Sequence, residues 1–314
     1  MTQPQAQPQI IAVTGASGFI GSHIALALRA AGFEVVGVVR TPAKAKWLEA
    51  HGVSIRQADL ADPAALQAAF DGVNAVVANA ALGSNQGTLE EMVKTNRDGV
   101  SNTLQAAAGA DVKRIVQISS VSVYKTRLYT AIDESTRLKD TSRKGFDWSN
   151  ITTDWRYAHS KTLAEAHGWE LAASLGLAMT SLRPSPVYGS RDPKATLKLS
   201  KSLAGRVRFV PTIGVPWVHA GDIAIATVGA LNNSASIGQA YNIAGPPISQ
   251  ATFMGTLRDA LEARHGRKFA YIVPIPLPVW VRFDTGAAER DLGFSARPLA
   301  EGLAEAVQDL DLGA

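Results

Sequence analysis

A tyrosine and a lysine four residues apart, Tyr157 and Lys161 in the segment RYAHSK, are suited to proton transfer. On a helix this spacing places both side chains on one face. The pKa of a phenol is ordinarily about 10, which is too high for proton transfer at neutral pH. An ammonium group one turn away favours the phenolate and lowers that pKa. We therefore expect Tyr157 to protonate a carbonyl oxygen, or to remove the proton of an alcohol, with Lys161 as its partner.

Three serines end a nearby apolar run in the segment QISSVSVY, at Ser119, Ser120 and Ser122. Hydroxyl groups at the carboxyl edge of a parallel sheet face the ligand crevice. One of them could donate a hydrogen bond to the substrate oxygen and stabilise its developing charge. The alternative is that all three bond to local backbone groups.

Three glycines spaced three apart, Gly15, Gly18 and Gly21, lie in the segment TGASGFIGSH. The segment follows an apolar run and precedes an alanine-rich stretch, as in a strand–turn–helix unit. In such a unit the first glycine permits the turn, the second admits a pyrophosphate and the third allows helix and strand to pack closely. The helix N-terminus then faces the phosphates with free N–H groups. The pattern predicts a dinucleotide site that also includes Ser17, Phe19 and Ile20.

Apolar runs and alanine-rich stretches alternate through the first half of the chain. The runs are expected to form parallel strands that are buried on both faces, at residues 9–15, 33–40, 53–59, 73–81 and 112–120. Helices are expected between them, at residues 22–32, 62–72 and 88–110, the second with Asp62 as N-cap and Pro63 at its first position. This order predicts the α/β class: a doubly wound parallel sheet, or Rossmann fold.

The second half has a long irregular stretch near residues 125–155, a helix from Tyr157 to Ser174 and a strand over 177–184. Beyond Pro184 the glycine and proline content rises, although residues 239–245 resemble a last sheet strand. We predict a dinucleotide-binding domain over residues 1–184 with a returning part around 215–245. A smaller C-terminal substrate lobe should comprise residues 185–214 and 246–314.

The end of the second strand bears on the choice of dinucleotide. A ribose 2′-hydroxyl usually meets an acidic residue there, but Val39 occupies that position and Arg40 follows. A guanidinium binds a 2′-phosphate bidentately, and Lys44 and Lys46 lie just beyond. NADP is therefore favoured over NAD. The alternative for Arg40 is an exposed residue that stacks on the adenine.

Other strand ends should complete the cofactor site. Asp59 and Leu60 close the third strand and are expected near the adenine, although an Asp in a turn often serves only local bonds. The ends of the fourth and sixth predicted strands add Asn79, Ala80, Ala81 and Pro184.

Several segments together resemble the extended short-chain dehydrogenase/reductase family, which includes nucleotide-sugar epimerases and dehydratases, dihydroflavonol-type reductases and 3β-hydroxysteroid dehydrogenases. They occur in the family's order and span nearly the whole chain: TGASGFIG, TNRDGVSNTLQAA, VQISSVSVY, YAHSK, LRPSPVYG, VHAGDIA and YNIAG. The resemblance implies that Ser120, Tyr157 and Lys161 are the catalytic set, with Lys161 also bonding the nicotinamide ribose. It implies a structural Asn96, holding the fourth helix against the fifth strand, and a possible homodimer through the fourth and sixth helices.

The sequence departs from the nucleotide-sugar members of that family. Pro186 stands where they commonly carry an Asn, and Val215, Pro216 and Trp217 replace the segment in which they place an Arg. These residues offer a diphosphate no charged donor. The dehydratases' Asp-Glu pair is also missing, because Val121 and Ser122 follow Ser120.

These departures favour an NADP-dependent reductase or dehydrogenase acting on a carbonyl or secondary alcohol of an apolar or cyclic small molecule. Its substrate pocket is expected to include Ser122, Pro186, Val187 and Trp217, although the apolar members also suit a lobe core. The alternatives are a nucleotide-sugar 4-epimerase with tightly bound NAD and a catalytically silent NADP-binding sensor.

Composition limits the remaining possibilities. The 314 residues carry a net charge of +4, with 18% charged and 46% hydrophobic residues, which suits a large buried core and no nucleic-acid partner. The chain has no cysteine, so disulfides and thiolate metal sites are excluded, and its six histidines lack ligand spacing. No apolar run is long enough to span a bilayer, and the polar first nine residues do not resemble a signal peptide. We expect a cytoplasmic protein without metal or membrane partners.

Overall fold

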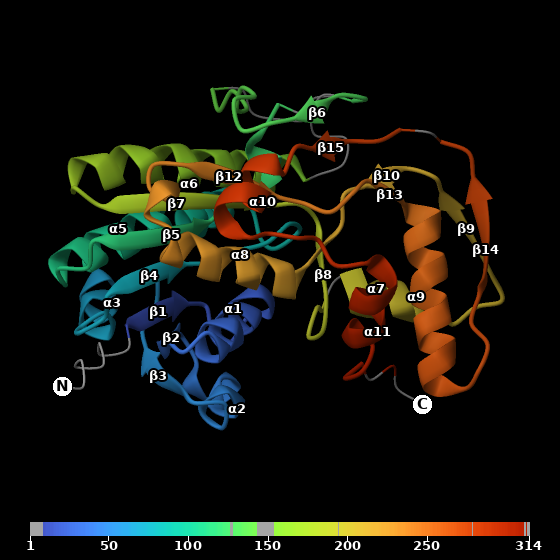
Figure 1. Cartoon of the computed structure of the whole chain (residues 1–314), viewed down its shortest axis with the longest axis horizontal. Helices are drawn as coiled ribbons and strands as arrows, with labels where there is room; N and C mark the ends of the chain where they lie inside the picture. Colours follow the sequence, from blue (N-terminus) through green and yellow to red (C-terminus); the bar gives the residue numbers. More distant parts are fainter. Residues whose placement is uncertain are drawn as a thin grey trace, which may run out of the picture.

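A seven-stranded parallel sheet forms the centre of the molecule in a computed structural model, which describes residues 9–125, 128–142, 154–193, 195–277, 279–310 and 312. Its strand order is β12-β7-β5-β4-β1-β2-β3, and every neighbouring pair is parallel (Figure 1). This order confirms the doubly wound sheet. The strands are β1 Ile10–Thr14, β2 Glu34–Val39, β3 Val53–Gln57, β4 Ala75–Ala78, β5 Arg114–Ile118, β7 Ala178–Pro184 and β12 Ala240–Ile243.

Helices cover both faces of this sheet, which buries the strands as their apolar sequences predict. One face packs against α1 (Phe19–Ala30), α8 (Ala220–Asn232) and α10 (Gly286–Leu292). The other packs against α3 (Pro63–Ala69), α5 (Gly99–Gly109) and α6 (Trp155–Ser174). The expected helix start at Asp62 is confirmed, because its carboxylate accepts a hydrogen bond from the backbone N–H of Ala65 at 3.0 Å.

Two helical features differ from the sequence prediction. The helix expected over 88–110 consists of α4 (Leu89–Val93), a π-helical turn at Lys94–Asp98 and then α5. A π-turn adds a residue to the helix, and it often marks a functional position. A short 3₁₀ turn (Pro42–Lys44) and α2 (Lys46–Glu49), which were not predicted, join β2 to β3.

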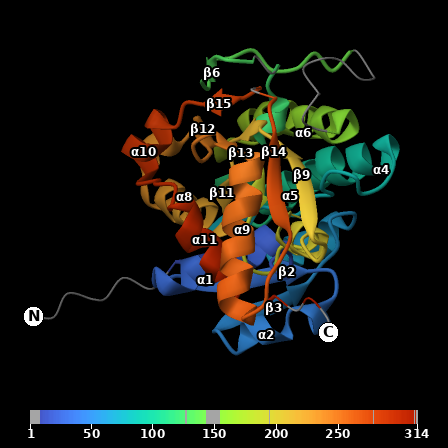
Figure 2. The same ribbon diagram turned by 90° about the vertical axis from the view of Figure 1, so that its right-hand side faces the viewer.

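A smaller lobe has its own hydrophobic core, which includes Leu203, Phe253, Leu257, Leu261 and Leu303. Helix α9 (Gln250–His265) lies against the parallel pair β9 (Val207–Pro211) and β14 (Tyr271–Ile275), as Figure 2 shows. Helices α7 (Ala195–Ser202) and α11 (Leu299–Ala306) complete this lobe. The remaining short elements are β6 Ala131–Ile132, β8 Val187–Tyr188, β10 Gly214–Val215, β11 Val218–His219, β13 Ile248–Ser249, β15 Arg282–Phe283, and the 3₁₀ turns Val121–Val123 and Ser234–Ser236.

Helix α10 differs from the predicted division of the chain. It falls within residues 246–314, which were expected to form the lobe, yet Ala288 and Leu292 belong to the core of the sheet. In Figure 1, α10 lies beside β12 and α8, away from the lobe's α9. The chain therefore returns to the sheet once more than its sequence pattern indicated.

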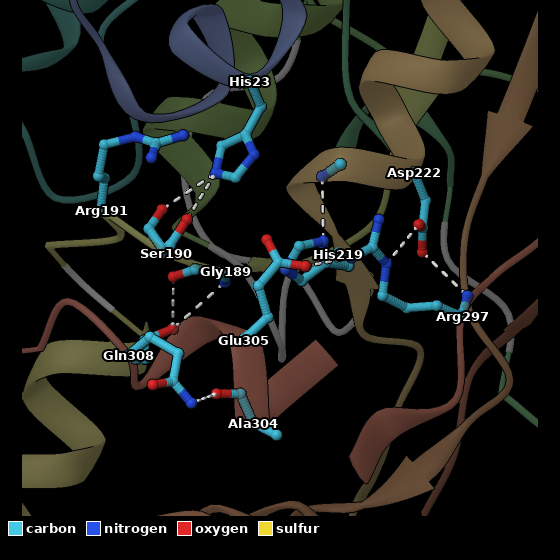
Figure 3. A network of polar contacts seen from close by, with 12 residues as sticks. His23, Gly189, Ser190, Arg191, His219, Asp222, Arg297, Ala304, Glu305 and Gln308 are labelled. Carbon is cyan, nitrogen blue, oxygen red and sulfur yellow. Dashed lines mark hydrogen bonds and ion pairs between the residues drawn. The ribbon is translucent and has the colours of Figure 1, made fainter. Parts of the chain in front are cut away.

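Arg297 connects the lobe to the sheet. Its Nε donates to the buried Asp222 at the start of α8, with 2.7 Å between the atoms, and a second ion pair joins it to Glu305 on α11 (Figure 3). One side chain therefore bridges a sheet helix and a lobe helix. Within the described ranges, no helix is both long enough and apolar enough to cross a membrane.

Candidate active site

A cavity of about 1040 Å³ lies at the carboxyl edge of the sheet, where it meets the lobe. The ends of β1, β2, β3, β4, β5 and β7 all contribute to its wall. The structure brings almost every residue of the predicted site to this wall: Gly15, Ser17, Gly18, Phe19, Ile20, Arg40, Asp59, Leu60, Asn79, Ala80, Ala81, Ser120, Ser122, Tyr157, Lys161, Pro184, Pro186, Val187 and Trp217. Gly21 is the one predicted residue that does not line the cavity.

The glycine-rich turn leaves backbone exposed at the cavity. Gly15 has a φ of 67°, which favours glycine, and a Cβ there would lie 3.0 Å from the Cα of Ala80. Gly18 is the N-cap of α1 and has no side chain to occupy the first free N–H groups. Such a helix end has the shape and the partial positive charge that suit a phosphate.

Gly21 serves packing within the turn. A Cβ at this position would lie 2.2 Å from the carbonyl oxygen of Gly15 and 2.7 Å from Nδ2 of Asn79. The structure therefore supports the expected close packing by the third glycine and gives Gly21 no place on the cavity wall.

Gly21→Ala should lower the free energy of unfolding by about 1–3 kcal/mol, because the new methyl overlaps a backbone carbonyl that cannot move freely. Urea denaturation would measure this loss. Gly255→Ala, in the middle of α9, is the matched control, because a Cβ there meets nothing within 4 Å. An equally stable Gly21→Ala protein would contradict this packing.

The segment after β4 is held by two polar side chains, Thr14 and Asn96. Thr14 Oγ1 accepts from the backbone N–H groups of Asn79 at 3.0 Å and Ala80 at 3.1 Å. The buried Asn96, in the π-turn, accepts from Leu82 N at 2.7 Å and donates to Ser160 Oγ on α6 at 2.9 Å. Asn96 was expected to hold its helix against the fifth strand, but its side chain instead joins the segment after β4 to α6.

Tyr157 and Lys161 lie on the first turns of α6, which begins after the N-cap Asp154. The Tyr157 hydroxyl is hydrogen-bonded to Ser120, and Lys161 Nζ donates to the carbonyl oxygen of Ile118 at 2.8 Å. The end of β5 is thus bonded to both side chains. This contact distinguishes Ser120 from Ser119, whose hydroxyl donates to Glu165 behind the cavity wall.

The pKa of Tyr157 is shifted in the opposite direction to the sequence prediction, and the pKa of its neighbour Lys161 is shifted as well. Burial raises the pKa of Tyr157, and only the Ser120 hydrogen bond acts in the opposite direction. Burial also lowers the pKa of Lys161 to about 8, against the opposing effect of Glu165. The expected lowering of the Tyr157 pKa by Lys161 is therefore wrong for this structure, in which the ammonium donates to Ile118. At neutral pH Tyr157 keeps its proton and can act as an acid.

Arg40 lies exposed at the rim of the cavity, next to the buried Val39. Its backbone carbonyl accepts from Gln57 Nε2 at 3.2 Å, while its guanidinium has no hydrogen bond or ion pair with any residue that the structure describes. Asp59 also lines the cavity, but its Oδ1 already accepts from Ala61 N at 2.9 Å. That bond matches the local role that sequence reasoning left open for Asp59.

The loop after β8 is a part of the cavity wall that the sequence analysis missed. Asp192 and Pro193 line the cavity. His23 Nε2 lies 3.0 Å from the carbonyl oxygen of Ser190, and Figure 3 shows the His23 ring directed at Ser190. Burial lowers the pKa of His23 to about 4, so its ring is neutral and donates to that carbonyl. The loop follows Gly189, and no motif in its sequence marked it as a wall.

Comparison with known proteins places this geometry in a family. The model of the NAD dependent epimerase/dehydratase family matches residues 11–244. Cinnamoyl-CoA reductase 1 of Oryza sativa subsp. japonica is 28% identical, covering 96% of this chain and 90% of its own. Cinnamoyl-CoA reductase 1 of Arabidopsis thaliana is 32% identical, covering 69% of this chain and 65% of its own. The crystal structure of gox2253 has a TM-score of 0.79 at 24% identity and covers 95% of this chain and 97% of that one.

The chain therefore belongs to the NAD dependent epimerase/dehydratase family. It is an NAD(P)-dependent oxidoreductase of the extended short-chain dehydrogenase/reductase type.

Proposed function

We propose that this protein is an NADP-dependent reductase or dehydrogenase that acts on a carbonyl or secondary alcohol of an apolar or cyclic small molecule. The observation that carries this proposal is the position of Tyr157, bonded to Ser120 and one turn from Lys161, on the wall of the cavity that begins at Gly15. The relatives whose names designate reductases support the same direction of chemistry.

The residues present fit a nicotinamide dinucleotide. The turn from Gly15 to Gly18 leaves room for the pyrophosphate beside the start of α1, whose first N–H groups have no capping side chain. Arg40 lies at the rim with its guanidinium available to a 2′-phosphate. Asn79–Ala81 and Pro184 complete the wall along the strand ends. When bound, NADPH would supply a hydride to the carbonyl carbon of the substrate.

The side chains of this site would bind the substrate oxygen and transfer a proton to it. Ser120 holds the substrate oxygen by a hydrogen bond. Tyr157 Oη gives its proton to that oxygen in reduction and removes it in the reverse direction. Lys161, one helical turn away, would orient the nicotinamide ribose through its ammonium group.

An apolar substrate suits the lobe side of the cavity. Pro186, Val187 and Trp217 line it there, and none of them carries a charge. Trp217 also stacks on Phe253 in the lobe core, with 4.4 Å between the ring centroids. Trp217 therefore lines the cavity and packs in the lobe core at the same time.

The proposed function can be tested with purified protein, NADPH and a panel of aromatic aldehydes, cyclic ketones and nucleotide sugars. We expect NADPH to bind more tightly than NADH and to lose absorbance with at least one aromatic or cyclic carbonyl. Tight NADPH binding without oxidation across the panel would indicate a sensor. Turnover of a nucleotide sugar without added cofactor would indicate a 4-epimerase.

Ser122→Ala should raise KM for the carbonyl substrate several-fold without lowering stability. Ser122 Oγ is buried on the cavity wall with no hydrogen-bond partner among the described residues. Removing an unpaired buried hydroxyl relieves a penalty of about 1–3 kcal/mol, so the free energy of unfolding should hold or rise. Steady-state kinetics and urea denaturation measure the two quantities.

Ser200→Ala is the matched control for this prediction, because its hydroxyl is equally buried and unpaired but does not line the cavity. It should leave KM unchanged. An unchanged KM in Ser122→Ala as well would remove Ser122 from the substrate pocket.

A further inference from the structure

A buried ion pair lies behind the wall of the cavity, between Glu165 on α6 and Arg183 on β7. Glu165 is fully buried and Arg183 is 5% exposed. Arg183 Nε lies 2.9 Å from one carboxylate oxygen and 3.2 Å from the other, and Nη2 donates to the first of these. Ser119 Oγ donates to the second oxygen. The proposed reaction uses none of these three side chains directly.

Further hydrogen bonds hold the Arg183 side of this ion pair. Arg183 Nη1 donates to the hydroxyl of the buried Tyr124 at 2.6 Å, and that hydroxyl donates to Oδ1 of Asn242 on β12 at 2.8 Å. Asn242 in turn donates to the backbone carbonyls of Ile132 and Asp284. The carboxylate of Glu165 is therefore held in one position by a chain of hydrogen bonds through Arg183, Tyr124 and Asn242.

Such a pair is a poor means of stabilising the fold. Removing two charges from water costs several kcal/mol, and their attraction often does no more than offset this cost. Each member, however, is next to the site. Glu165 lies one helical turn beyond Lys161, Arg183 precedes Pro184 of the cavity wall, and Ser119 precedes Ser120.

Glu165 is also the carboxylate that lies one helical turn from Lys161 on α6. Burial lowers the pKa of Lys161, and the negative charge of Glu165 raises it. The elements packed against α6 are α4, the π-turn, α5, the 3₁₀ turn after β5, and β7. The charged side chains of these elements in the described structure are Glu90, Glu91, Lys94, Arg97, Asp98 and Arg183.

We propose that Glu165 is a positioning residue of the active site, which Arg183 and Ser119 hold in place so that its carboxylate keeps Lys161 protonated one turn away. Glu165 touches neither substrate nor cofactor in this account and acts through Lys161. The inference rests on the proposed function for its catalytic meaning, while the charge state of Lys161 can be measured without any turnover.

The test is the titration of Lys161 in the cofactor-free protein, followed by NMR of ¹³C-labelled lysine side chains and assigned with Lys161→Met. In Glu165→Gln we expect the pKa of Lys161 to fall by about one unit or more, because an opposite charge nearby shifts a pKa by about 1–3 units. In the active protein the alkaline limb of kcat/KM should move to lower pH by the same amount.

Glu170→Gln is the matched control, since Glu170 lies on the same helix with an 80% exposed side chain. It should leave both the titration and the pH profile unchanged. Because Glu165→Gln leaves Arg183 buried without its counter-ion, the double variant Glu165→Gln/Arg183→Met provides a second measurement in a protein with neither charge. It should show a downward shift of the Lys161 pKa that is smaller than in Glu165→Gln, because the opposing positive charge of Arg183 is removed as well.

A Lys161 pKa that stays at its wild-type value in the double variant would overturn the proposal, even if activity were lost. A lower Lys161 pKa in both variants supports it whether or not a substrate has been found. If the wild-type protein reduced no carbonyl, the proposed function would fail by that separate observation.

Discussion

Tyr157→Phe should lower kcat/KM for carbonyl reduction by about two decades or more, the typical contribution of a positioned general acid. The phenol is the proton donor of the account, and burial raises its pKa so that it holds its proton at neutral pH. The ring itself remains in the variant, so the cavity keeps its shape and NADPH affinity should change little. Steady-state kinetics and a fluorescence titration with NADPH measure the two effects.

Tyr271→Phe makes the same chemical change at a side chain that is 65% exposed on β14 of the lobe, and it should have wild-type kinetics. Full activity in Tyr157→Phe would mean that another group donates the proton. A large loss of NADPH affinity would mean that Tyr157 chiefly binds the cofactor.

Arg40→Asp should weaken NADPH binding by about 10- to 100-fold or more, since a charge-assisted hydrogen bond contributes about 1.5–3 kcal/mol and the new carboxylate repels the 2′-phosphate. NADH lacks that phosphate, so its affinity should hold or improve. The prediction depends on the free guanidinium at the rim of the cavity, beside an apolar Val39. Calorimetric titration with both dinucleotides gives the ratio directly.

Arg208→Asp, at an exposed position on β9, reproduces the change in net charge away from the cavity and should affect both dinucleotides equally and weakly. Parallel losses of NADPH and NADH in Arg40→Asp would contradict the choice of NADP. They would instead favour the alternative in which Arg40 stacks on the adenine that both cofactors share.

The sheet could be predicted because parallel strands buried on both faces have nearly continuous apolar sequences, such as EVVGVV in β2. The glycine turn was predictable for a related reason. Only a missing side chain allows Gly15 its positive φ and lets Gly21 approach the Gly15 carbonyl. Both are local properties, which short stretches of sequence carry.

Features that depend on contacts between distant segments escaped prediction. In the π-turn, the side chain of Asn96 bonds to Leu82 and Ser160, which lie far from it in the sequence. The apolar stripe of α10 gives no sign of which hydrophobic core it joins. Likewise, the spacing of Tyr157 and Lys161 predicted that they share a face, but the burial that raises the tyrosine's pKa is a property of the assembled cavity.

A crystal structure of the protein with NADP⁺ tests the central claim most directly. The account predicts the pyrophosphate over the backbone from Gly15 to Gly18, the 2′-phosphate at Arg40, and the nicotinamide beside the hydroxyl of Tyr157. A dinucleotide bound outside this cavity, or a nicotinamide beyond the reach of that hydroxyl, would contradict it.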